Sequence, residues 1–178
     1  MARPLSQSLL PSLEIGLNAL SAILEKAEAF AVEKKIDQAA LLATRLYPNM
    51  LPLSRQVQIA SDQAKNGSSR LAGIDPPRHE DNETSLAQLR ERVAKSLAQV
   101  KSVDAKAIDG AGDRDISFPL GPVNKGHMKG EDYLNHFVLP NFYFHIATTY
   151  AILRQAGLDI GKSDYLGKIP MTLSQPGG

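Results

Sequence analysis

The chain has 178 residues, 43% of them hydrophobic, which is long enough for one domain with a full core. Its 20 Lys and Arg residues nearly balance 19 Asp and Glu residues, which argues against nucleic-acid and membrane partners. Because cysteine is absent, a disulfide framework, a thiol nucleophile and a Cys zinc site are all excluded. No stretch approaches the roughly 20 apolar residues of a membrane span. The N-terminal region also lacks the apolar run of a signal peptide, so we expect a cytoplasmic protein.

The first half of the chain predicts two long helices. From Leu9 to Ala31, leucine and alanine recur at steps of three and four, which places them on one helical stripe. Asp37 is positioned to cap a short helical turn, and two prolines then break the chain. The second long helix is expected over 53–71 and ends at Gly73.

A third long helix and an extended crossover follow. The third helix opens at Ser85, with Gln88 at the spacing of a capping box. The glycine-rich segment 109–130 is expected to form an extended crossover or a weak hairpin. Its one alternating run would place three apolar side chains on a shared face: Ile116, Phe118 and Leu120.

The last long helix begins with acidic residues in its first turn and ends at Gly157. It is apolar nearly all round and should be the most buried helix. Pro140 interrupts the pattern, either as a kink that widens the structure near His145 or as a break between two shorter helices. The remaining residues, about 158–178, are expected to form an irregular tail.

These elements predict a single all-α domain spanning 1–178. Each amphipathic stripe needs a partner, so four long helices with one crossover favour a four-helix bundle.

The last helix carries the main candidate site. Asn141 and His145 are four residues apart and therefore share a face. His145 is the candidate metal ligand, yet one His and one Asn fall short of the three protein ligands usual for catalytic zinc. The alternative is a neutral His145 that hydrogen-bonds to a neighbouring helix within the core.

The second helix supplies further candidate ligand-binding residues: Arg55, Gln56 and Asp62. A carboxylate that faces the interior could orient the His145 ring, whereas the ordinary interpretation of these positions is a solvent-facing salt-bridge array. The segment "GLDIGKS" ends like a phosphate-binding loop, but it has three residues between its glycines instead of four and follows a helix. We therefore expect no nucleotide site there.

Four blocks of sequence resemble an uncharacterised bacterial and fungal family, a domain of unknown function grouped with the DinB/YfiT-like metalloenzyme superfamily. The blocks are "LYPNMLPLSRQVQIASDQAK", "RLAG", "LPNFYFHIATTYAILRQAG" and "GKSDYLG", in that order. The resemblance covers almost the whole chain. It implies an up-down-down-up four-helix bundle with an extended crossover before the last helix, and commonly a homodimer.

The resemblance also implies where a metal would sit. Typical superfamily members hold a divalent metal with one His of helix two and a His-x-x-x-His pair on the last helix, and some use thiol cofactors. The second His of that pair falls on His145, and the first falls on Asn141. Helix two contains no histidine, so two of three ligands are missing.

Three functional hypotheses remain, and the sequence leaves open whether the protein is an enzyme. The leading one is a DinB-like bundle that binds a small molecule or a partner at a degenerate former metal site. The second is a thiol-dependent transferase or hydrolase with a divalent metal, Zn or Ni, held by His145. The third is a structural dimerisation module, which an exposed apolar strip on helix one or two would favour.

Overall fold

The computed structural model describes residues 3–172, and they are predominantly helical, as predicted. A small two-stranded sheet is also present, within the segment where a weak hairpin was one of the two expected structures. The elements are α1 (Leu5–Glu33), α2 (Gln38–Ala43), α3 (Leu53–Leu71), α4 (Leu86–Ser102), α5 (Ala105–Asp109), β1 (Asp115–Leu120), β2 (Asn124–Lys129), α6 (Gly130–Asp132), the π-helix η1 (Tyr133–Val138), α7 (Leu139–Gln155) and α8 (Lys162–Leu166).

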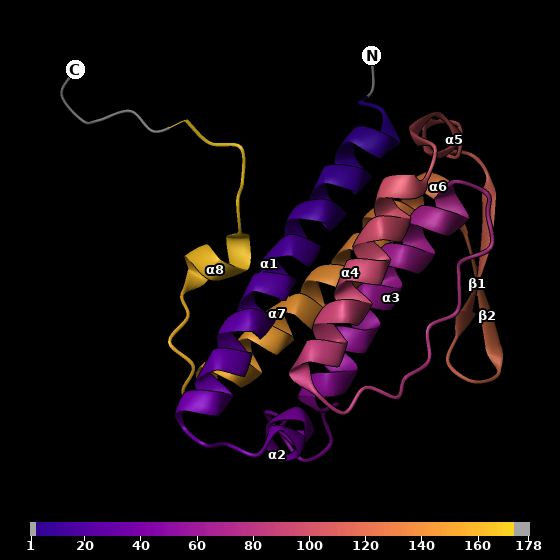
Figure 1. Cartoon of the computed structure of the whole chain (residues 1–178). Coiled ribbons are helices and arrows are strands. Elements are labelled where there is room, and N and C mark those ends of the chain that lie inside the picture. The colour runs from indigo at the N-terminus through magenta and orange to yellow at the C-terminus, as the bar shows by residue number, and fades with distance from the viewer. Residues whose placement is uncertain (1–2, 173–178) are drawn as a thin grey trace.

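The four long helices α1, α3, α4 and α7 lie side by side, with α1 and α7 running in one direction and α3 and α4 in the other (Figure 1). The parallel pairing of α3 and α4 is visible in two contacts with the same sequence offset. Arg92 donates to Asp62, and Gln99 donates to Ser69, each across 30 residues. The parallel pair requires a long return, and residues 72–85 run back along the two helices to provide it.

Helix α7 is antiparallel to α3, and contacts at the two ends of the pair show this. Gln56 meets His145 near the start of α3, and Arg70 meets Tyr133 near its end. Between them the two backbones approach closely, because a Cβ at Gly67 would lie 2.5 Å from a methyl carbon of Val138.

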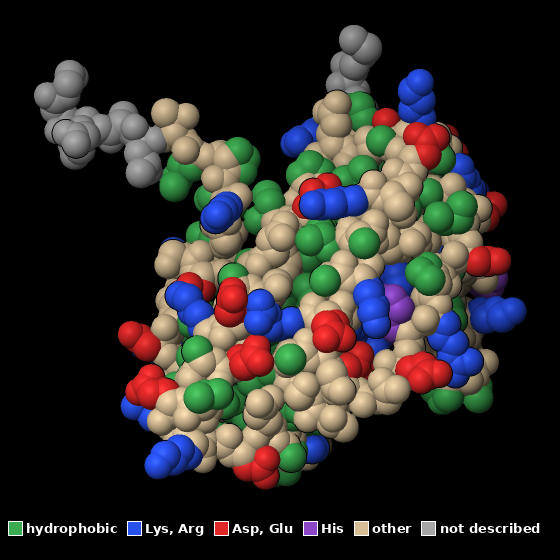
Figure 2. Space-filling view, viewed as in Figure 1, with side chains coloured by type: hydrophobic (Ala, Val, Ile, Leu, Met, Phe, Trp, Pro, Cys, Tyr) green, Lys and Arg blue, Asp and Glu red, His purple; other side chains and the backbone are tan. Residues whose placement is uncertain are grey.

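The leucine stripe predicted on the first helix forms the centre of the core. Five leucines of this helix are fully buried: Leu9, Leu13, Leu17, Leu20 and Leu24. Each such side chain contributes about 1.5–3 kcal/mol through burial. Leu10, which the prediction also placed on the stripe, is only partly buried. Most acidic and basic side chains lie outside, and Figure 2 shows them interspersed, without a patch of one sign, on the face made by α1 and α4.

The predicted helix ends are largely confirmed. Asp37 accepts a hydrogen bond from the Ala39 amide, and Gly157 adopts a φ of 99° after α7. Ser85 accepts from the Gln88 amide at 3.2 Å. The second hydrogen bond of the predicted capping box, from the Ser85 amide to the Gln88 side chain, is not formed. The side-chain oxygen of Gln88 accepts instead from the backbone amide and the hydroxyl of Thr84.

The crossover segment forms an antiparallel hairpin, which is the second of the two structures expected there. Ile116 and Phe118 are buried as predicted, and Phe118 packs against Tyr133 with a ring separation of 4.8 Å. Leu120 is 49% exposed, so the predicted shared apolar face is wrong at its last member. Leu120 is the last residue of β1, next to a turn in which Val123 is also exposed.

Pro140 neither separates two helices nor follows an ordinary α-helical turn. The chain is helical from η1 into α7, and the Leu139 amide donates to the Leu134 carbonyl five residues back. Because proline has no amide hydrogen, a π-helical stretch before it lets the helix continue past Pro140 with a local change of register.

Two expectations for the C-terminal third are wrong. Helix α7 is not the most buried helix, because Tyr143 and Phe144 are 39% and 57% exposed. The tail is not wholly irregular, since α8 forms within it, and the Gly161 amide donates to the Asp164 carboxylate at 2.8 Å to start that turn. The rest of the predicted tail, residues 173–178, lies outside the described residues.

Candidate functional site

Of the polar residues predicted on the second helix, Gln56 is the one that meets His145. The Nδ1 atom of His145 lies 2.7 Å from Oε1 of Gln56, and Gln56 Nε2 donates to the Leu51 carbonyl at 3.0 Å. With this amide orientation, His145 Nδ1 carries the hydrogen and donates it. Both side chains are buried, so the bond joins α3 to α7 inside the protein.

The surroundings of His145 keep the imidazole neutral. Burial lowers its pKa from 6.5 to about 4, because a charged ring would lose its hydration there. No carboxylate is paired with this ring within residues 3–172, so nothing offsets that cost.

Asn141 lies one helical turn before His145, as predicted, but its amide turns back along its own helix. Its Nδ2 atom donates to the Phe137 carbonyl at 2.7 Å, next to the π-helical stretch. Asn141 therefore satisfies helix backbone beside Pro140, and within residues 3–172 its side chain forms no hydrogen bond to another helix.

Arg55 and Asp62 do not join this site. Arg55 pairs with Asp81 of the return segment, and Asp62 lies 3.0 Å from Arg92 and 3.1 Å from Lys65. The hypothesis that Asp62 orients the His145 ring is therefore wrong, because Asp62 lies on the side of α3 that faces α4. Its alternative, a salt-bridge array, describes these residues, although the array is partly buried.

Arg92 is the centre of that array, which we call the Arg92 cluster. Its guanidinium is 2% exposed and contacts the carboxylates of Asp62, Asp81 and Glu83 at 2.9–3.0 Å. It also donates to the Glu80 carbonyl. The cluster attaches residues 80–83 to α3 and α4. Burial alone would raise the pKa of the Glu83 carboxyl, but hydrogen bonds from Arg92 and Gln58 outweigh it and hold that pKa below its usual value.

The polar residues near His145 do not fit a divalent metal. The donor set is one imidazole and two neutral amides, and the Gln56 oxygen is already paired with the imidazole at 2.7 Å. Within residues 3–172, no group of three or more His, Asp or Glu side chains is placed to hold a metal ion. No chemical step through a metal can therefore be assigned to these residues.

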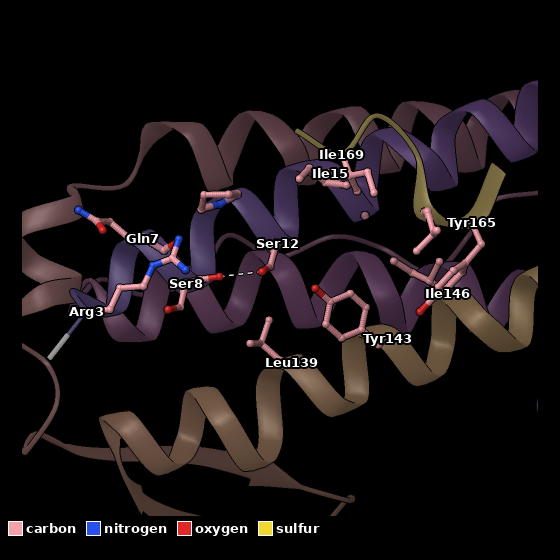
Figure 3. Close-up of a pocket in the computed structure, with 13 residues that line it drawn as sticks. Arg3, Gln7, Ser8, Ser12, Ile15, Leu139, Tyr143, Ile146, Tyr165 and Ile169 are labelled. Carbon is pink, nitrogen blue, oxygen red and sulfur yellow. Dashed lines mark hydrogen bonds between the residues drawn. The ribbon is translucent and has the colours of Figure 1, made fainter. Parts of the chain in front are cut away.

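A cavity of about 360 Å³ lies on another side of α7, between α1, α7, α8 and the residues that follow α8. We call it the α1–α8 cavity. Its apolar lining consists of Pro11, Ile15, Leu139, Ile146, Leu166 and Ile169. Its polar lining consists of Arg3, Gln7, Ser8, Ser12, Tyr143 and Tyr165. Figure 3 shows Arg3 at one end, Tyr165 at the other and Tyr143 between them.

The two tyrosine hydroxyls of this cavity are open to a ligand. Neither forms a hydrogen bond with another group of the described chain, and both side chains retain solvent contact. Burial raises the pKa of Tyr165, and the nearby Tyr143 raises it further. A tyrosine hydroxyl can both donate and accept a hydrogen bond.

Sequence reasoning missed this cavity because its residues come from three separate segments. One signal was present: "SDYLG" places Tyr165 in a short helix after Gly161, and α8 then brings this ring toward α1 and α7. The close approach of α1 and α7 is also encoded, since a Cβ at Gly16 would lie 2.6 Å from the Phe142 ring.

Comparison with known proteins matches residues 5–166 to the family described as Domain of unknown function (DUF1993). The chain belongs to the DUF1993 family. It is also similar to a crystal structure of a DinB family member protein from Shewanella denitrificans, with 40% sequence identity, a TM-score of 0.86 and 96% of each chain covered. No curated protein matches the chain.

Membership of DUF1993 confirms the resemblance drawn from the four sequence blocks. The DUF1993 match spans α1 to α8, so it includes both the His145–Gln56 pair and most of the α1–α8 cavity. Within residues 3–172, no helix is long and apolar enough to cross a membrane.

Proposed function

We propose that this DUF1993 protein binds a small, largely apolar molecule in the α1–α8 cavity without a resident metal. The observation that carries the proposal is the combination of an apolar lining with two unpaired tyrosine hydroxyls. Ligand pockets have this composition, with a few polar groups that fix orientation, and begin at about 300 Å³.

The His145–Gln56 pair has a structural role in this proposal. Its hydrogen bond joins α3 to α7 at the place where the superfamily resemblance puts a metal bound by residues of both helices. We further propose that the chain forms the up-down-down-up bundle of DinB-like proteins, which the directions of α1, α3, α4 and α7 support.

Homodimerisation stays a prediction for this chain. A dimerisation module would present an apolar strip on α1 or α3. Among large hydrophobic side chains of the described residues, Val32 is the exposed one on α1, and α3 has none. The cavity therefore has the stronger physical support as the functional feature.

Filling the cavity tests the proposal. Ser12 lines it from α1, and Ser12→Phe would occupy its space with a ring. With N-phenyl-1-naphthylamine, a neutral dye that fluoresces in apolar surroundings, we expect Ser12→Phe to weaken binding at least about tenfold. The measurement is a fluorescence titration at constant protein concentration.

Ser21→Phe is the matched control. Ser21 lies nine residues further along α1, which at 100° per residue is the opposite side of the helix. It is half-buried like Ser12 and does not line the cavity. We expect Ser21→Phe to bind the dye as the parent does. Equal binding by the parent and Ser12→Phe would contradict the proposed site.

A further inference from the structure

The charge distribution of the α1–α8 cavity identifies the class of its ligand, an inference that rests on the proposed function. We infer that the ligand is an amphipathic anion, with an apolar body in the cavity and one carboxylate-type group beside Arg3. Arg3 is the one charged residue among the side chains that line this cavity.

Arg3 is available to pair with an anion. One of its terminal nitrogens donates to the Gln7 carbonyl at 3.0 Å, which directs the side chain along α1. Within residues 3–172 it forms no salt bridge, whereas Arg55, Arg90, Arg92 and Arg154 each pair with a carboxylate. Its remaining N–H groups can therefore donate hydrogen bonds to an anion. The planar guanidinium is well suited to a carboxylate, which can accept two such bonds side by side.

The rest of the cavity suits an apolar body of limited length. Ser8 and Ile15 are seven residues apart on α1, which is about 10 Å along the helix axis. Ile15 and Ile146 provide the apolar walls over this distance, and Tyr143 lies along it (Figure 3). A chain of about eight carbons or a pair of fused rings has the matching length.

The absence of acidic groups from the lining disfavours a cationic ligand. The polar cavity of about 400 Å³ beside the Arg92 cluster offers a contrast, because it is lined by carboxylates of Glu80, Glu83 and Glu91 as well as by cations. The described lining of the α1–α8 cavity has a cation at one end and neutral groups elsewhere. An anion therefore gains attraction there without repulsion from a lining carboxylate.

Two dyes that differ in one charged group test the inference. 8-Anilinonaphthalene-1-sulfonate is N-phenyl-1-naphthylamine with an added sulfonate. We expect the parent protein to bind the sulfonate about two- to fivefold more tightly than the neutral dye at low salt, as an ion pair at a partly exposed site allows. The preference should decrease as salt rises, because added ions screen exposed charges. Displacement by octanoate, and weaker displacement by octan-1-ol, extends the comparison to carboxylates.

Arg3→Gln should remove the preference for the sulfonate, so that the variant binds the two dyes with equal affinity. Arg45→Gln is the matched control, since Arg45 is also exposed, donates to a backbone carbonyl and lies outside the cavity lining. It should keep the parent preference. Equal affinity of the parent for both dyes, or a preference that survives Arg3→Gln, would overturn the anion inference while leaving the cavity intact. Failure of both dyes to respond to Ser12→Phe would instead overturn the proposed function.

Discussion

Replacement of Arg92 by methionine is expected to lower the free energy of unfolding by about 3 kcal/mol. Methionine keeps much of the aliphatic volume but removes the charge that compensates Asp62, Asp81 and Glu83. Because the Glu83 carboxylate is 9% exposed, it would be left buried without its cationic partner. Urea unfolding followed by circular dichroism measures the loss.

Arg90→Met is the matched control for this prediction. Arg90 lies two residues earlier on the same helix and pairs with Glu25 and Glu28, but its side chain is 33% exposed. We expect it to cost no more than about 1 kcal/mol. Arg92→Met should also increase trypsin cleavage after Arg78, because residues 80–83 lose their attachment to α4. Equal losses of stability in the two variants, with unchanged cleavage, would contradict the role given to the Arg92 cluster.

Acidification from pH 7 to 4.5 is expected to destabilise the protein by about 2 kcal/mol through His145 alone. The unfolded chain takes up a proton at His145 near pH 6.5, whereas the folded ring, with a pKa of about 4, does not. The stability from the neutral ring is therefore fully present above pH 6.5 and is lost as pH falls toward 4. Unfolding curves of the parent and His145→Gln at several pH values measure the difference.

Gln56→Glu provides a sharper variant of the same site. It keeps the shape of the side chain but places a carboxylate where the amide oxygen now lies, 2.7 Å from the imidazole. An adjacent negative charge favours the protonated ring, so we expect His145 to titrate at a higher pH than in the parent. Nuclear magnetic resonance of the imidazole protons follows this directly. A His145 ring that titrates near 6.5 in the parent would contradict the buried neutral state.

The sequence pattern predicted the second helix well because its apolar period is regular. It also contained the information that selects Gln56 over Arg55 and Asp62. Gln56, Ala60 and Ala64 recur at steps of four and share the face that packs on α7. Asp62 is displaced by 200° from Ala60 around the helix. Extending the apolar stripe back by one turn would have placed Gln56 inside and Asp62 outside this interface.

Other features depend on contacts between distant segments and had no local signal. The sequence of residues 72–85 predicts an exposed polar loop, yet the side chain of Glu83 is nearly buried. Burial of this carboxylate is possible because Arg92 of α4 compensates its charge. Patterns of apolar residues report which side of a helix is buried, but they do not report which charged residue on another segment compensates a buried carboxylate.

The central claim, small-molecule binding without a metal, is tested most directly by one dye titration on metal-depleted protein. The untagged chain is dialysed against EDTA, its loss of zinc, nickel, manganese and iron is verified by elemental analysis, and it is titrated with N-phenyl-1-naphthylamine. The account predicts saturable binding at one site, unchanged by the depletion and weakened at least about tenfold in Ser12→Phe. Binding that disappears with the metal and returns when zinc or nickel is restored would contradict it.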